Sequence, residues 1–169
     1  YTNGDWEMFG ARIRNDIQPL RYDDNFGHSL RVNGKRVAIG SPGKNWENSA
    51  VFDSGLVAVY EYSESARNWQ LLGNTITSAA PGQGDQLGFA VDLQGSTLVV
   101  STPGKNGRGQ VDLFYYNSSN KQWEANPNPL MGTAGSNFGF SVHLTTNIAV
   151  GSAVSDGINA GMVNVFHQQ

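Results

Sequence analysis

The 169-residue chain contains no cysteine and few charged residues. Without a thiol it can form no disulfide, no thiolate metal site and no cysteine nucleophile. Charged side chains make up 15% of the sequence, against about 25% in an average protein. The net charge is −3 and no basic stripe is present, which argues against nucleic-acid binding. No apolar run approaches the roughly 18 residues that a membrane-spanning helix needs.

Glycine is the residue that the sequence has in excess. It contributes 21 residues, where average composition would give about 12. Hydrophobic residues make up 38% of the chain, enough for a folded core. This composition favours many strands joined by tight turns. It predicts a single all-β domain or domain segment over residues 1–169.

A stretch of 22 residues occurs twice, and a weaker third copy follows. Residues 24–45 (DNFGHSLRVNGKRVAIGSPGKN) and 85–106 (DQLGFAVDLQGSTLVVSTPGKN) share three glycines, their apolar runs and a final Pro-Gly-Lys-Asn. The third copy is 136–157 (SNFGFSVHLTTNIAVGSAVSDG). Repeats spaced by 50 to 60 residues indicate that one supersecondary unit is repeated along the chain.

Each copy predicts the same series of short antiparallel strands. An alternating run follows the glycines Gly27, Gly88 and Gly139, and a tight turn such as Asn33-Gly34 leads into an apolar, β-branched run. A glycine then introduces a third run, and a tryptophan opens a fourth. The expected strands are 26–30, 36–40, 55–60 and 69–73 in copy one, 87–91, 97–101, 109–114 and 123–124 in copy two, and 138–142, 147–151 and 161–166 in copy three.

The third copy ends before a fourth strand, but residues 6–13 match residues 69–76. The sequence therefore predicts three four-stranded antiparallel units, with the N-terminal strand completing the last unit of this or a neighbouring chain. The expected units are about 14–76, 77–130, and 131–169 together with 1–13.

The series Phe-Gly-x-Ser, Ile-Gly-Ser-Pro and Gly-x-Val-x-Val-Tyr resembles the FG-GAP repeat, which builds the propeller heads of integrin α-subunits. Copy three departs from it, because Ala153 stands where the other copies have Pro42 and Pro103. The resemblance implies a β-propeller in an extracellular or cell-surface protein. Many such blades carry a calcium loop, but the corresponding turns here hold no carboxylate, so neither a metal nor another cofactor is expected.

Three blades are fewer than the four to eight of known propellers. Two chains could complete six blades, each N-terminal strand finishing the last blade of its neighbour. Alternatively, the chain lies beside further blades of a longer protein. We therefore expect self-association or neighbouring blades.

No catalytic residue is predicted. The histidines His28, His143 and His167 are interpreted as strand residues with ordinary hydrogen bonds rather than as metal ligands. Asp23, Asp24 and Asp85 precede repeated strands, where an aspartate accepts backbone N–H groups. The two Pro-Gly-Lys-Asn segments lack the pattern of a phosphate-binding loop and are interpreted as turns. The chain is therefore expected not to be an enzyme.

The loop after Pro42 is much longer than its equivalent in copy two, and Trp46 and Phe52 lie outside the repeat pattern. Loops on a rigid scaffold commonly carry binding residues. The predicted ligand-binding residues are Lys44, Asn45, Trp46, Phe52 and Asp53. Alternatively, Trp46 packs onto its own blade or seals a contact between subunits.

Asn117 begins a glycosylation sequon, Asn-Ser-Ser, between two predicted strands. The expected function is a non-catalytic adhesion, structural or protein-interaction module with a protein or glycan partner. The alternatives are a lectin-like propeller that binds sugars through Trp46, a hydrolase or lyase with its carboxylates near the axis, and a subunit of a fibre or coat.

Overall fold

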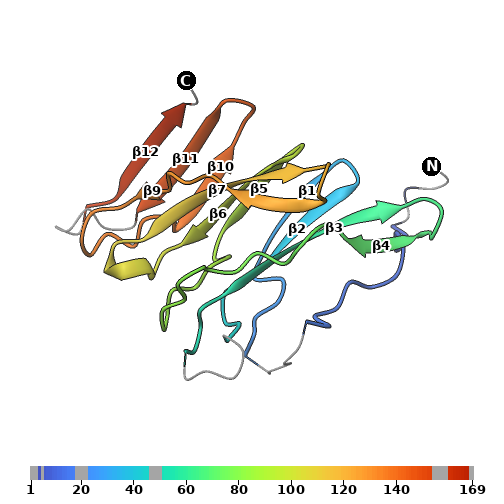
Figure 1. The fold of residues 1–169 in the computed structure, drawn as a ribbon, viewed down its shortest axis with the longest axis horizontal. Coiled ribbons are helices and arrows are strands. Elements are labelled where there is room, and N and C mark those ends of the chain that lie inside the picture. The colour runs from blue at the N-terminus through green and yellow to red at the C-terminus, as the bar shows by residue number, and fades with distance from the viewer. Residues whose placement is uncertain (1–3, 5, 18–22, 46–50, 154–159, 168–169) are drawn as a thin grey trace.

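The computed structural model describes residues 4, 6–17, 23–45, 51–153 and 160–167. These residues form twelve strands in three antiparallel sheets, and their only helical element is a 3₁₀ turn, η1 (Lys105–Gly107). Figure 1 shows the first sheet and the third sheet at opposite ends of the molecule, with the second between them. The all-β prediction is confirmed.

The first sheet has the order β1-β2-β3-β4. Its strands are β1 (Ser29–Asn33), β2 (Arg36–Ser41), β3 (Leu56–Ser63) and β4 (Asn68–Leu71). The Asn-Gly turn lies between β1 and β2 as predicted, and Gly34 adopts the left-handed φ of 59° that this turn needs. Copy one thus has the four strands that were predicted, although β1 begins three residues after the predicted start of its strand.

The second sheet repeats this order with β5 (Val91–Gln94), β6 (Thr97–Thr102), β7 (Gln110–Asn117) and β8 (Gln122–Ala125). A further short strand, β9 (Leu130–Met131), pairs with the beginning of β7. In the first sheet Ile76 forms the equivalent bridge to Val57. In both of these sheets the outer strand is therefore interrupted, and the chain then pairs again with the same third strand, β3 or β7.

The third sheet contains β10 (Ser141–Leu144), β11 (Ile148–Ala153) and β12 (Met162–His167), in that order. It has three strands within the described part of the chain. The prediction that residues 6–13 complete it within the same chain is wrong. Those residues form no strand and lie against the first sheet, where Phe9 stacks on Tyr62 with ring centroids 4.0 Å apart.

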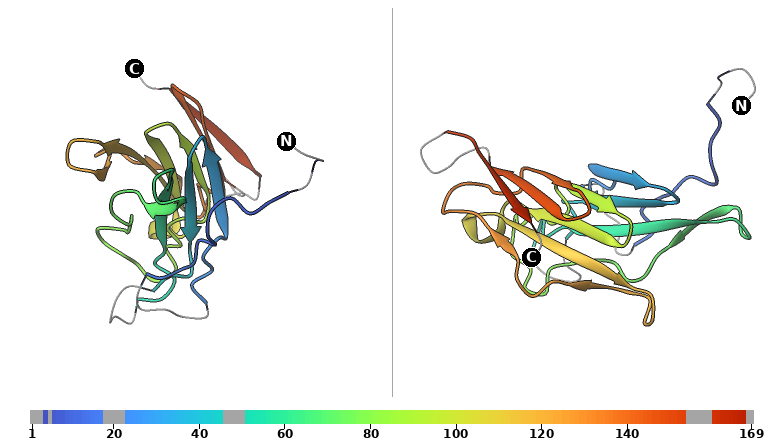
Figure 2. Two further views of the ribbon diagram at one scale, coloured as in Figure 1. Left: turned by 90° about the vertical axis from the view of Figure 1, so that its right-hand side faces the viewer. Right: turned by 90° about the horizontal axis from the view of Figure 1, so that it is seen from above.

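The sheets pack face to face and bury two apolar cores. We call the contact between the first and second sheets the first joint, and that between the second and third sheets the second joint. The first core contains Val57, Val59, Leu93, Leu98 and Trp123, among others. The second contains Val99, Val111, Phe138, Leu144 and Ala149. Figure 2 shows the same succession of sheets from two further sides.

Main-chain bridges also link the sheets. Gly55 pairs in parallel with Leu87 across the first joint, and Gly109 pairs with Phe138 across the second. A Cβ atom on Gly55 would lie 2.1 Å from the Leu87 carbonyl oxygen, and one on Gly109 would lie 2.2 Å from that of Phe138. Only glycine permits this approach, which explains the glycines before β3 and β7.

No closed ring of sheets is formed by the residues described. Among them there is also no helix long and apolar enough to cross a membrane.

Candidate functional site

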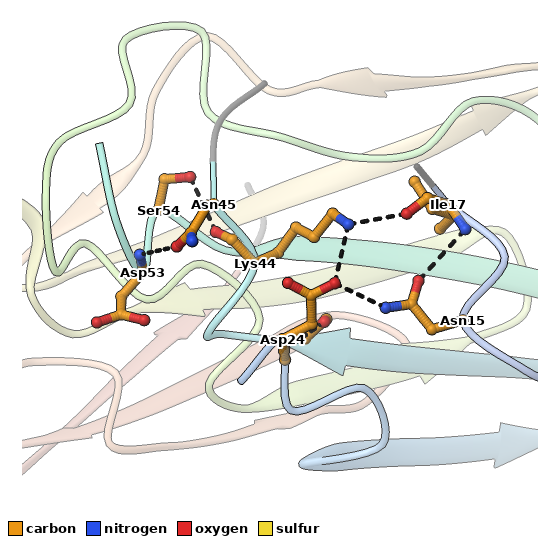
Figure 3. A network of polar contacts seen from close by, with 8 residues as sticks. Asn15, Ile17, Asp24, Lys44, Asn45, Asp53 and Ser54 are labelled. Carbon is orange, nitrogen blue, oxygen red and sulfur yellow. Dashed lines mark hydrogen bonds and ion pairs between the residues drawn. The ribbon is translucent and has the colours of Figure 1, made fainter. Parts of the chain in front are cut away.

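Lys44, predicted to bind a ligand, is buried in an ion pair (Figure 3). Its Nζ lies 2.9 Å from Asp24 Oδ2 and donates a hydrogen bond of 2.8 Å to the carbonyl oxygen of Ile17. Asn15 Nδ2 donates to the same Asp24 oxygen at 3.0 Å. Lys44 thus connects the N-terminal segment to the first sheet, and its ammonium is not presented to a ligand.

Asn45 is buried as well, and it shapes the long loop. Its Oδ1 accepts a hydrogen bond from the Asp53 N–H at 2.8 Å, and Ser54 Oγ donates to the Lys44 carbonyl at 3.1 Å (Figure 3). The Asp53 carbonyl in turn accepts from the Gln86 N–H of the second unit. Among the predicted ligand-binding residues, the side chain of Phe52 is exposed. Trp46 lies outside the described residues.

The ion pair recurs one repeat later. Lys105 Nζ lies 2.7 Å from Asp85 Oδ2 and also donates to Ser78 Oγ and to the Ala80 carbonyl. Asp85 Oδ2 accepts the Gly82 N–H as well, as predicted for an aspartate at a strand-entry turn. Sequence analysis did not pair these residues. The signal was present, because each lysine follows its aspartate by 20 residues in both copies.

The third copy replaces this pair with a neutral contact. Ser136, which occupies the position of Asp24 and Asp85, is fully buried and donates from Oγ to the Arg108 carbonyl at 2.7 Å. The second joint therefore holds no lysine–aspartate pair of this kind within the described residues.

Another buried carboxylate, which could not be singled out from local sequence, connects all three sheets. Asp92 of β5 is 2% exposed. Its Oδ1 lies 2.8 Å from Arg31 Nε on β1, and its Oδ2 lies 2.8 Å from His143 Nδ1 on β10. Oδ2 also accepts the Leu144 N–H. Arg31, Asp92 and His143 occupy the same repeat position, and this equivalence could have identified the cluster.

A row of aromatic rings crosses the three sheets at the beginning of their inner strands. His28, Phe89 and Phe140 each follow the repeat glycine. The centroids of His28 and Phe89 are 4.8 Å apart, and those of Phe89 and Phe140 are 5.2 Å apart. His28 and Phe140 are exposed, and Phe89 is half-buried between them. We call these three residues the aromatic ledge.

Amide side chains accompany the aromatic ledge. Asn25, Gln86 and Asn137 lie three residues before the rings, and all three have a left-handed φ between 50° and 60°. Gln86 and Asn137 line a hollow of about 330 Å³ with Phe89 and Phe140. Within the described structure their side-chain amides make no hydrogen bond, so their donors and acceptors face the hollow or solvent.

Another hollow, of about 290 Å³, lies at the first joint and contains Lys105, Gln110 and Asp112. Burial raises the pKa of the Asp112 carboxyl, although Gln110 Nε2 hydrogen-bonds to both of its oxygens and Lys105 lies nearby, which oppose the rise. This carboxylate also went unnoticed in the sequence, where it occupies a position held by Ala58 and Asn164 in the other copies.

The remaining predicted sites are distributed over the molecule. Asn117 lies at the end of β7, and its Nδ2, the atom to which a glycan would be attached, donates to Glu124 Oε1 at 3.0 Å. Asp24 and Asp85 belong to separate ion pairs rather than to one carboxylate pair. No group of three or more His, Cys, Asp or Glu side chains suited to a metal occurs in the described part of the chain.

No protein-family model matches the chain, and no curated protein is significantly similar to it. The resemblance to FG-GAP repeats therefore rests on the repeated motifs themselves.

Proposed function

We propose that the chain is a non-catalytic recognition module built from FG-GAP-like propeller blades and displayed outside the cell or at its surface. The repeated sheets, stacked in sequence order through equivalent bridges, support the blade assignment. The repeated lysine–aspartate pairs have structural partners, which favours a scaffold over an active site.

The observation that carries the proposal is the aromatic ledge. Three rings follow one another across the sheets, each with an amide residue three positions before it, and buried ion pairs hold the corresponding loops of the first two units. A rigid surface of this kind gives contact area from the rings at low entropic cost and directional hydrogen bonds from the amides. It suits a protein segment that lies across several blades.

Glycan binding is the second candidate, and the hollow beside Phe140 favours it. The rings can stack on the C–H faces of a sugar, while the amides of Gln86 and Asn137 can pair with hydroxyl groups. Few charged side chains surround the hollow, as suits a neutral ligand. The predicted contribution of Trp46 is not required for this site.

The test is a screen of immobilised glycans and of extracellular-matrix proteins, followed by titration of whatever binds. Phe140→Ala should weaken binding by roughly 30-fold, as expected for an exposed aromatic contact residue. Met131→Ala, at an equally exposed apolar residue away from the ledge, is the matched control and should bind normally. Equal binding by the Phe140 variant would refute the ledge as the site, and cleavage of a bound glycan would refute a non-catalytic role.

A further inference from the structure

The second joint contains a hollow of about 190 Å³. Its apolar wall comes from both sheets, and its polar residues come from the segment after β8, from the turn between β10 and β11 and from the strands. The lining includes Leu113, Leu130, Leu144, Ala149, Phe166 and the side chains of Asn126 and Asn128.

In the first joint a tryptophan fills the equivalent place. Trp123 of β8 is buried in the first core, and its Nε1 donates to the Leu72 carbonyl at 2.9 Å. Its backbone N–H donates to Asn74 Oδ1 at 2.7 Å. By repeat position Leu72 corresponds to Asn126 and Asn74 to Asn128. The hollow is therefore the site where a fourth strand of the third sheet would insert its tryptophan.

The N-terminal segment already lies where the outer strand of a preceding sheet would lie. Trp69 Nε1 donates to the Phe9 carbonyl at 2.9 Å, just as Trp123 Nε1 donates to the Leu72 carbonyl. Gly10 packs on Tyr62 and Trp69, and Gly73 packs in the same way on Tyr116 and Trp123. The Lys44 bond to the Ile17 carbonyl likewise matches the Lys105 bond to the Ala80 carbonyl.

Residues 6–13 therefore have the position of a fourth strand, but they pair with no strand in the described part of their own chain. Trp6, which corresponds to Trp69 and Trp123, is fully exposed. Figure 1 shows the N-terminus beyond the first sheet and the C-terminus beside the third, at the other end of the molecule. No described residue of the chain pairs with the free edge of β12, which is therefore open to a strand from another copy.

The outer faces of the third sheet and of the first sheet expose apolar residues whose equivalents are buried at the first joint. Val163 and Val165 on β12 are 64% and 65% exposed, whereas their equivalents in the first sheet, Val57 and Val59, are fully buried. We call Val163 and Val165 the trailing face.

At the opposite end, Leu30 and Val32 on β1 are 64% and 58% exposed, and we call them the leading face. Their equivalents in the second sheet, Val91 and Leu93, are buried against the first sheet. A trailing face packed on a leading face would therefore reproduce the existing joints.

We propose that two copies of this chain associate head to tail. Residues 6–13 of one copy pair with the β12 edge of the other as its fourth strand, and Trp6 enters the hollow lined by Ala149 and Phe166. The leading face of the first copy then covers the trailing face of the second. Because six is the only multiple of three among known blade numbers of four to eight, two copies close the ring.

The first measurement is the mass of the chain in solution between about 1 and 100 µM, by light scattering. A mass of about 36 kDa, twice the 18.2 kDa of one chain, is expected at the upper concentrations. A mass of one chain over the whole range would overturn the proposal. So would a dimer unaffected by the substitutions that follow.

Trp6→Ala should weaken association by roughly 30-fold or more, because it empties the hollow. Val163→Lys should weaken it by roughly 100-fold, because a lysine would be buried against an apolar face. Both side chains are exposed in the single chain, so neither change should alter its unfolding temperature. Met131→Lys, at an exposed residue outside both faces, is the control and should associate normally.

A mixture of the two variants tests the head-to-tail geometry. The Val163→Lys chain can still donate its N-terminal strand, and the Trp6→Ala chain can still accept it. At a concentration where each variant alone is monomeric, the mixture should therefore show the mass of a dimer. This mixed dimer has one intact contact between the two chains, whereas the wild-type dimer has two. Failure to recover it would overturn the arrangement. These measurements do not depend on the aromatic ledge or its ligand.

Discussion

The first and second joints connect sheets of the same kind but differ in how they are filled. The first joint has Leu98 and Trp123 in its core and the Lys105–Asp85 pair at its loop end. The second joint has Ala149 at the position of Leu98 and a serine in place of the aspartate, and no described residue forms a fourth strand there. A hollow remains where the tryptophan is missing.

This difference separates what a joint requires from what strengthens it. Both joints keep the parallel glycine bridge and an apolar core. The tryptophan, the bulky leucine and the ion pair are additions that the second joint does without. The second joint should therefore be the less stable one in an isolated chain. Substitutions that remove one of these features from the first joint measure how much that feature contributes to stability.

Trp123→Ala removes the largest of these additions. It should lower the free energy of unfolding by about 3–5 kcal/mol, because it deletes a buried indole and leaves a cavity. Denaturant unfolding followed by circular dichroism measures the loss. Trp6→Ala, studied at a concentration where the chain is monomeric, is the control and should cost almost nothing. A loss below about 1 kcal/mol for Trp123→Ala would show that the indole does not hold the joint.

Lys105→Met should lower the free energy of unfolding by about 3 kcal/mol at pH 7, because it leaves the buried Asp85 carboxylate without its cation. The double variant Lys105→Met, Asp85→Ser copies the chemistry of Ser136 and should regain most of that loss. Chemical denaturation of wild type and both variants gives the comparison. If the double variant is no more stable than the single one, the buried charge is not the source of the loss.

Asp112→Asn has the smallest expected effect and depends on pH. Burial raises the pKa of Asp112 in the folded chain above the ordinary value of 3.8. At a pH between the pKa of Asp112 in the unfolded chain and its raised pKa in the folded chain, the folded state holds more protons than the unfolded state. Wild-type stability therefore falls as pH rises above 3.8.

Asparagine, which occupies the equivalent position as Asn164, cannot ionise and should avoid this loss. Thermal unfolding between about pH 3 and pH 7 should show the variant gaining on wild type as pH rises. Parallel curves for the two proteins would contradict the raised pKa.

The strands of the repeats could be predicted from sequence, because alternation, β-branched runs and Asn-Gly turns are local signals. The fourth strand illustrates the limit. Residues 6–13 carry the sequence of an outer strand, but whether they pair with β12 depends on which chain lies beside it, and no local pattern encodes that. Their position against Tyr62 and Trp69 follows from packing between units.

The candidate site was less predictable than the fold. Lys44 and Asn45 look like loop residues available to a ligand, but burial of the loop end turns them into structural contacts. Asp92 and Asp112 gave no local signal, because their environments are made by neighbouring sheets. The aromatic ledge was visible as a repeated position, but its continuity depends on how the sheets stack.

The bridges at Gly55 and Gly109 have a consequence for how such a protein can change over generations. They are formed by main-chain atoms and require only that one residue lack a Cβ atom. The surrounding side chains can therefore drift, as the loss of charge and bulk at the second joint illustrates, while the order of the units is maintained. A unit that keeps this glycine and an apolar face therefore meets the two requirements that both joints share.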